Sequence, residues 1–232
     1  MISVKDLFDS YSIKSRLAPA LFVSIICLYV TRSVFLHSDI LTLSNPLLFP
    51  GALLLLLFIV ASLMRVVGKF VVEAIMFKGK NQFPSHKMLK GSTPKLISVQ
   101  KMQEIHNKIK DDLKIDVRER AQLLENNSEE LNLEIEEMIE FIRDKTRDDS
   151  LLKRLNIDYG FWRNLSASMI ILTIYLAIVV IYLLNSNNEL YIAYLLGMIA
   201  SLAGIILCLI FTNKFASDYA KRLFSVYESL PT

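Results

Sequence analysis

Four long apolar runs constrain this chain more than any other feature of its sequence. Each run holds 20 to 22 residues and contains no acidic side chain. A bilayer core about 30 Å thick is crossed by roughly 20 apolar helical residues, and few helices of soluble proteins are apolar on every face over that length. The sequence therefore predicts an all-α integral membrane protein with four transmembrane helices. The predicted spans are Leu17–Leu36, Leu47–Val67, Leu165–Leu184 and Leu190–Phe211.

The rest of the composition excludes several other classes of protein. The 232 residues include only seven Gly, six Pro and two Cys, which excludes a collagen-like, disordered or disulfide-rich chain. Both cysteines, Cys27 and Cys208, lie inside apolar runs. We expect them to be small packing residues and to form neither a disulfide nor a metal site.

The basic residues outside the spans predict the orientation of the chain. The first 16 residues and the last 19 each contain three Lys or Arg, whereas the loops 37–46 and 185–189 contain none. The positive-inside rule then places both termini and the long middle segment in the cytoplasm. The predicted parts are a cytoplasmic N-terminal segment, two spans, a charged helical insertion, two further spans and a cytoplasmic tail. Their bounds are 1–16, 17–77, 78–163, 164–213 and 214–232.

Three basic residues near the ends of the first two spans are pore or gating candidates. Arg32 lies near the end of the first span, where it either extends to the outer headgroups or lines the mouth of a pore and repels cations or attracts anions. The second run continues in helical phase through Arg65 and Lys69. We expect that helix to leave the membrane near Arg65, with both cations at the inner headgroups.

An aromatic segment precedes the third span. Trp162, which is the only Trp, and Arg163 follow Tyr159 and Phe161 in this segment. One interpretation is an inner-leaflet aromatic anchor with an arginine that reaches the headgroups. The alternative is a gating elbow that passes movements of the cytoplasmic helices to the third span. Both residues are therefore gating candidates.

The cytoplasmic insertion divides into two oppositely charged stretches. Lys78–Lys114 carries nine bases and three acids, and Ile115–Asp149 carries five bases and twelve acids. The basic stretch is the better candidate for binding an anionic signal, through phosphate contacts that weaken with salt; the alternative is a contact with the inner leaflet. The lysines proposed for this role are Lys87, Lys90, Lys101 and Lys108.

Apolar spacing predicts helices in both stretches. Thr93 and Pro94 are a suitable N-cap and first helical residue, followed by an apolar face that includes Val99, His106 and Ile109. Around Lys78–Gly91 the sequence reads as a loop. The acidic stretch forms either one helix over 117–146 or two helices separated at Asn126-Asn127.

The acidic stretch also carries an apolar seam. Its members recur at intervals of three and four residues, which is typical of a helix that packs on a partner or in a coiled coil. We predict that the seam holds an oligomer together. The residues are Leu131, Ile135, Met138 and Ile142.

No sequence pattern indicates catalysis. The chain has no HExxH, no CxxC, no glycine-rich phosphate loop and no Gly-x-Ser-x-Gly. Its three histidines are scattered over different predicted segments. We therefore expect no enzyme, no cofactor and no metal.

Four spans around a short, charged helical domain resemble the small membrane effectors of bacterial anti-phage systems. In size and plan the chain is similar to the channel subunit of Hailong-type systems, which are paired with a nucleotidyltransferase. The resemblance covers the whole chain in architecture and includes no diagnostic motif, so it assigns no residue. It implies an ion channel in the bacterial inner membrane that depolarises the infected cell. It also implies that a single-stranded oligodeoxyadenylate, made by the partner enzyme, holds the channel shut.

Two classes of function follow from these patterns. The first is a homo-oligomeric channel or pore in the lipid bilayer, gated by a nucleotide or oligonucleotide, with a conducting path on the axis between subunits. The second is a non-conducting membrane anchor or scaffold whose charged helices recruit a soluble partner. Ion current across a bilayer distinguishes the two.

Overall fold

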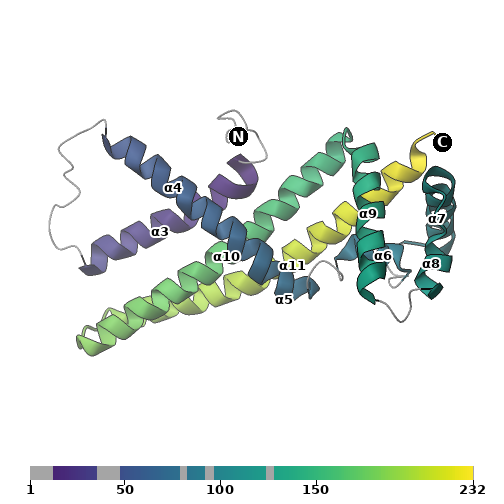
Figure 1. Cartoon of the computed structure of the whole chain (residues 1–232). Helices are drawn as coiled ribbons and strands as arrows, with labels where there is room; N and C mark the ends of the chain where they lie inside the picture. The colour runs from purple at the N-terminus through teal and green to yellow at the C-terminus, as the bar shows by residue number, and fades with distance from the viewer. Residues whose placement is uncertain (1–12, 36–47, 79–82, 92–96, 124–127, 232) are drawn as a thin grey trace. The chain divides into compact units, whose positions relative to one another are not determined.

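The computed structural model describes residues 13–35, 48–78, 83–91, 97–123 and 128–231, and every regular element in these ranges is helical. The chain forms two compact units. Unit 1 comprises Met1–Val72 and Gly160–Thr212, and unit 2 comprises Glu73–Tyr159 and Asn213–Thr232. Figure 1 labels the helices along the chain.

Unit 1 contains the apolar helices. A π-helical turn, η1 (Ile13–Leu17), leads into α3 (Ala18–Phe35), and α4 (Leu48–Val67) leads into a second π-helical turn, η2 (Gly68–Val72). Two much longer helices, α10 (Ser150–Asn185) and α11 (Tyr191–Ser229), contribute the rest. Among the described residues, three stretches, Ile13–Val34, α10 and α11, are long and apolar enough to cross a membrane.

The predicted second span coincides with α4 from Leu48 onward, and Leu47 lies outside the described residues. A multi-pass membrane protein is therefore consistent with the structure. Four crossings remain a prediction. The loop at 37–46 and the first twelve residues also lie outside the described part of the chain.

Small side chains bring α11 close to α10 inside unit 1. A Cβ added to Gly197 would lie 3.7 Å from Leu176, and one added to Gly204 would lie 3.5 Å from the sulfur of Met169. Without a hydrophobic driving force between helices in lipid, such close approach supplies dispersion contacts. The two helices lie side by side up to the turn between them (Figure 1).

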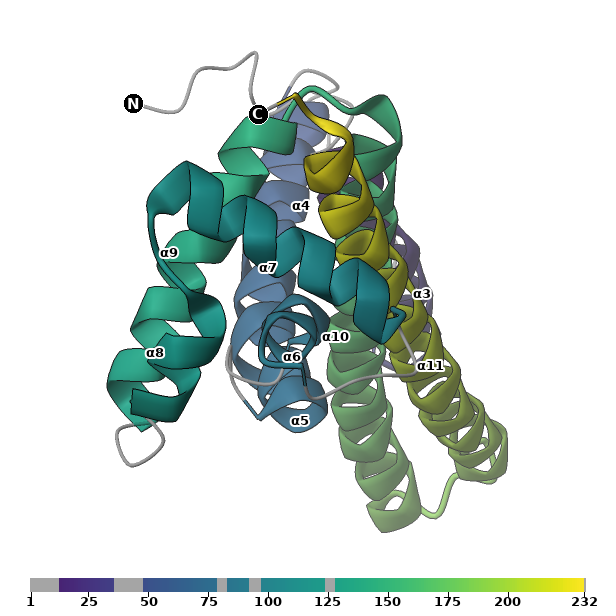
Figure 2. The same cartoon turned by 90° about the vertical axis from the view of Figure 1, so that its right-hand side faces the viewer.

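Unit 2 is a helical core of shorter elements. It contains α5 (Glu73–Phe77), α6 (Pro84–Leu89), α7 (Val99–Leu113), α8 (Val117–Leu123) and α9 (Ser128–Thr146). The start of α10 and the end of α11 complete it. Figure 2 shows α7 crossing in front of α6, with α8 and α9 beside it.

One prediction about unit 2 needs correction. The segment Lys78–Gly91, expected to be a loop, contains the helix α6, which begins at Pro84 and is almost wholly buried. Proline suits the first turn of a helix because its missing N–H has no intrahelical partner there. The expected cytoplasmic tail is a continuation of α11, and Leu223, Phe224 and Tyr227 of this tail are fully buried in the core.

The helices α7 and α9 begin at Val99 and Ser128. The helix α7 begins at Val99, where the hydroxyl of Ser98 accepts a hydrogen bond from the Lys101 backbone N–H at 3.3 Å. The expected cap Thr93 lies outside the described residues. The acidic stretch forms two helices, as one of the two alternatives predicted, although the proposed break at 126–127 also lies outside them.

Candidate functional site

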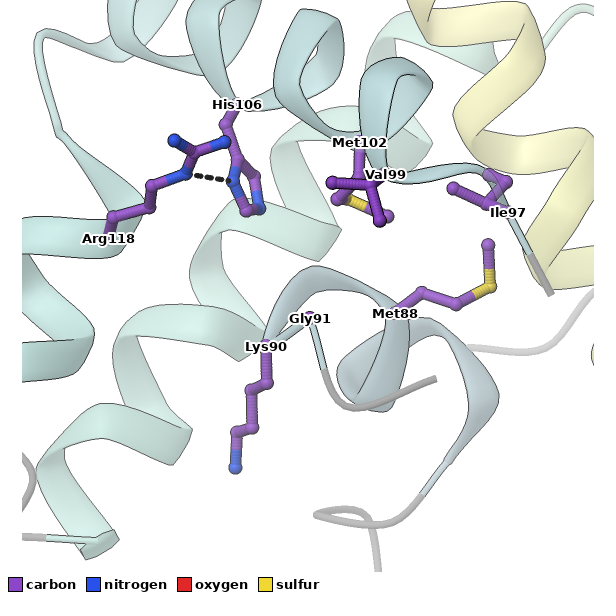
Figure 3. A pocket seen from close by; sticks show the side chains of 8 residues that line it. All are labelled: Met88, Lys90, Gly91, Ile97, Val99, Met102, His106 and Arg118. Atoms are coloured by element: carbon purple, nitrogen blue, oxygen red, sulfur yellow. Dashed lines mark hydrogen bonds between the residues drawn. The ribbon is translucent and has the colours of Figure 1, made fainter. Parts of the chain in front are cut away.

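A cavity of about 230 Å³ opens in unit 2 between α6, α7 and α8. Its walls are mainly apolar, and a histidine and an arginine meet at one end (Figure 3). The backbone at Gly91 has a φ of +71°, a conformation that glycine adopts without steric cost. The lining residues are Met88, Lys90, Gly91, Ile97, Val99, Met102, His106 and Arg118.

His106 has both ring nitrogens engaged. Its Nε2 lies 2.9 Å from the Leu89 carbonyl oxygen, and its Nδ1 lies 3.4 Å from Nε of Arg118. The carbonyl can only accept and the guanidinium can only donate. Nε2 therefore carries the proton and Nδ1 accepts the hydrogen bond from Arg118, so the imidazole is neutral in this arrangement.

The pKa of His106 lies below its ordinary value, in agreement with a neutral imidazole. Burial lowers the pKa of His106, and the charge of Arg118 lowers this pKa further. The hydrogen bond to Leu89 and the carboxylate of Asp116 each raise the pKa of His106, but the net change in this pKa is downward. A proton added at Nδ1 would remove the acceptor that Arg118 uses.

The position of Arg118 is set by the start of α8. The carboxylate of Asp116 accepts hydrogen bonds from the backbone N–H groups of Arg118 and Glu119, at 3.1 and 3.4 Å. It also pairs with Lys110 of α7 at 2.9 Å. The Lys110 contact lowers the pKa of Asp116. This cap links α8 to α7 and keeps the guanidinium at the cavity.

Three of the four lysines proposed for anion binding contact other parts of unit 2. Lys101 Nζ lies 2.8 Å from Glu228. Lys108 is buried, donates to the Leu230 carbonyl and lies over the Tyr227 ring, 5.5 Å from its centroid. Lys101 and Lys108 lie seven residues apart on one face of α7, and both contact residues of α11.

The two lysines of the α6 segment differ from each other. Lys90 donates a hydrogen bond to the Asn132 side chain of α9, and burial lowers the pKa of Lys90. Its side chain points away from the apolar wall of the cavity (Figure 3). Lys87 is half-buried on α6. Lys90, Lys101 and Lys108 are therefore engaged within unit 2, and anion binding by the lysine set stays a prediction.

The predicted oligomer seam lies in the core of unit 2. Ile135, Met138 and Ile142 are at most 2% exposed, and Leu131 packs against the same cluster. Their neighbours in that cluster come from the chain's own α6, α7 and α11. The seam thus has an intramolecular partner, and its role in an oligomer stays a prediction.

The pore and gating candidates are spread over unit 1. Arg32, Arg65 and Lys69 are exposed. Trp162 stacks on Phe211 of α11, with ring centroids 4.4 Å apart. The helix α10 continues through Trp162 from Ser150 to Asn185, and a gating role of Trp162 and Arg163 stays a prediction.

Sequence reasoning missed the polar contacts of α10 inside unit 1. The amide of Asn164 donates to the Ser15 carbonyl at 2.6 Å, and Thr173 lies 2.8 Å from Ser201 of α11. Further pairs join Ser166 to Thr212, Ser168 to Met64 and Tyr175 to Thr31. Their spacing of four and seven residues along α10 was a readable signal of two polar faces.

No family model, curated protein or solved structure matches this chain. The candidate site therefore depends on geometry alone.

Proposed function

We propose that the protein is a gated membrane effector, in which α3, α4, α10 and α11 cross the inner membrane of a bacterium. Both termini and unit 2 are cytoplasmic in this proposal. Several copies form an ion-conducting pore that depolarises the cell when a cytoplasmic signal arrives, as in anti-phage defence. The signal is a nucleotide or oligonucleotide made by a cognate nucleotidyltransferase.

The supporting observation is the continuity of α10 and α11. The same α10 places Leu152 in the core of unit 2 and Leu176 in the core of unit 1. Likewise, α11 runs from Ser201 in unit 1 to Tyr227 in unit 2 without a break in the helix. A change in packing around the cytoplasmic ends is therefore passed along helices that already contain the spans, which is the connection a gate requires.

The conducting path is proposed to lie between subunits. In the described part of unit 1, the polar side chains of α10 are hydrogen-bonded to neighbouring helices, as the pairs of Thr173 with Ser201 and Tyr175 with Thr31 illustrate. Such pairs hold a helix bundle together. A symmetry axis between copies provides a pore without breaking them.

The cavity at Arg118 is proposed to receive the signal. Its apolar wall suits the face of a nucleobase, and the guanidinium suits a phosphate, which arginine binds through parallel hydrogen bonds. The neutral His106 orients Arg118, because its Nδ1 accepts a hydrogen bond from Nε of Arg118. Movement of α8 would then follow ligand binding directly.

Current through a planar bilayer containing the purified full-length protein tests the proposal. We expect ion current, and we expect a single-stranded oligodeoxyadenylate to change that current. The variant Arg118→Gln should lose most of the ligand response while retaining the current. The matched control Arg147→Gln changes an exposed arginine of the same unit and should respond as the parent does.

Three outcomes would each contradict a part of the proposal. Silence of the parent with and without nucleotide would favour the alternative, a non-conducting anchor that recruits a soluble partner. A monomeric mass of the detergent-solubilised protein in native mass spectrometry would exclude the axial pore. An unchanged response of Arg118→Gln would move the signal site away from the cavity.

A further inference from the structure

The charged residues of unit 1 are strongly segregated. Its described residues contain six basic side chains and one acid, Glu189. Glu189 lies in the turn between α10 and α11, and Arg32 lies near the end of α3. The other five bases belong to η1, the end of α4, η2 and the first turns of α10 that lie in unit 1. They are Lys14, Arg16, Arg65, Lys69 and Arg163.

Contacts of Asn164 bring together the segments that carry these bases. The Asn164 side chain, which is 2% exposed, donates to the Ser15 carbonyl, and Ser15 lies between Lys14 and Arg16 in the chain. A Cβ added to Gly68, the residue before Lys69, would lie 3.0 Å from Oδ1 of Asn164. Three separate segments therefore meet at one buried amide.

Arg163 joins the same cluster. A Cβ on Gly68 would lie 3.5 Å from both Cγ and Nε of Arg163, so the absence of a side chain at Gly68 allows η2 to approach the arginine closely. Both η1 and η2 are π-helical here, and π-helical turns occur often at functional sites. The cluster is built from specific backbone geometry as well as from charge.

Exposed apolar side chains adjoin the cations. Val66 is 51% exposed and follows Arg65, and Phe70 is 69% exposed and follows Lys69. A soluble anion would contact the cations and leave the apolar side chains uncovered. A ligand with a phosphate and a hydrocarbon chain would use both the cations and the apolar surface, and basic pockets between helices at the cytoplasmic side bind anionic lipid headgroups.

We propose that η1, η2 and the adjoining part of α10 form a binding site for the phosphate headgroup of an anionic phospholipid. Arg16, Lys69 and Arg163 surround the headgroup, and an acyl chain lies along Val66 and Phe70. Asn164 is a positioning residue that holds the three segments together. The site uses the membrane location of the chain but requires neither conductance nor a nucleotide signal.

Thermal unfolding of the purified full-length protein in neutral detergent tests the site. Phosphatidylglycerol added to the micelles should raise the unfolding temperature of the parent, and phosphatidylcholine should not. The triple variant Arg16→Gln, Lys69→Gln, Arg163→Gln should bind phosphatidylglycerol on the order of 100-fold more weakly, because each cation contributes roughly a factor of five. The matched control Arg32→Gln, Lys145→Gln, Lys153→Gln should retain the full shift.

Further measurements keep the proposal falsifiable. If the triple variant does not fold, Lys69→Gln, which alters one exposed side chain, should weaken binding about fivefold by the same reasoning. Asn164→Leu should lower the selectivity for phosphatidylglycerol without changing the net charge. The proposal is overturned if the parent does not distinguish the two lipids or if the triple variant keeps its preference. A shift of equal size with inorganic phosphate would identify a free-phosphate site instead.

Discussion

At the scale of single residues, unit 2 depends on a few polar side chains with several partners each. Asp149 accepts a hydrogen bond from the Leu152 backbone N–H at 2.7 Å and pairs with Arg222 of α11 at 2.5 Å. His106 connects α6 to α8 through Leu89 and Arg118. The Leu152 contact caps the start of α10, whereas the Arg222 contact joins segments 73 residues apart in the sequence.

His106 should make unit 2 less stable in mild acid. Because the folded-state pKa of His106 lies below the unfolded value of about 6.5, the unfolded chain binds the proton first as the pH falls. The stability from the neutral imidazole is complete above pH about 6.5 and is lost as the pH falls through the folded pKa. We expect the unfolding temperature to drop more between pH 7.5 and 5.5 in the parent than in His106→Gln. Equal drops in both proteins would contradict the lowered pKa of His106 in the folded state.

Substitutions of Asp149 should separate its two roles. The hydrogen bond with Arg222 lowers the pKa of Asp149, so its stabilising effect is present above the unfolded pKa of about 3.9 and is lost as the pH falls below that value. At neutral pH, Asp149→Asn removes the charge and keeps a good cap, whereas Asp149→Ala also removes the cap, at a cost of about 1 kcal/mol.

The expected order of unfolding temperature, followed by circular dichroism, is parent, Asp149→Asn, Asp149→Ala. Asp148→Asn is the control, since the Asp148 side chain is 95% exposed. If Asp149→Asn were as stable as this control, the pair with Arg222 would contribute nothing.

At the scale of helices, sequence spacing predicted elements better than it predicted their partners. The apolar face of α7 is correct at His106 and Ile109, but Val99 is 67% exposed and the fully buried Ile105 was not included. The helix α6 was missed because six residues of mixed polarity show no period. Its burial comes from α7 and α9, which are remote in the sequence.

The end of α11 was predictable, and the cavity was not. Ala216, Ala220, Leu223 and Tyr227 are buried at intervals of three and four residues, a pattern that the predicted tail already contained. The cavity depends on residues from three segments, such as Met88, Met102 and Arg118. No local pattern indicates that such residues meet.

A charge in the α9 seam should unfold unit 2 rather than dissociate subunits. Ile135 is 1% exposed in a single copy, whereas Leu133 on the same helix is 59% exposed. Loss of a buried Ile side chain costs about 2–5 kcal/mol before any charge is counted, so Ile135→Asp should remove cooperative unfolding and Leu133→Asp should not. A folded Ile135→Asp protein with a smaller native mass would instead identify the seam as a contact between subunits.

At the scale of the whole molecule, the proposed function and the proposed lipid site depend on where the helices lie relative to the membrane. Three stretches are long and apolar enough to cross it, and α4 supplies the fourth crossing in the proposed topology. The proposed lipid site requires η1 and η2 on one side of the membrane, and the proposed signal cavity requires unit 2 in the cytoplasm. Together the two proposals require that the chain cross the membrane an even number of times between η1 and unit 2.

Labelling of single cysteines in intact cells tests this membrane topology. In a chain with Cys27 and Cys208 changed to Ser, an impermeant maleimide should label Ser38→Cys and Asn187→Cys. It should reach Ser150→Cys only after the membrane is opened. Labelling of Ser150→Cys in intact cells, with Asn187→Cys protected, would contradict the orientation. Protection of Ser38→Cys with labelling of Asn187→Cys would remove α4 as a crossing.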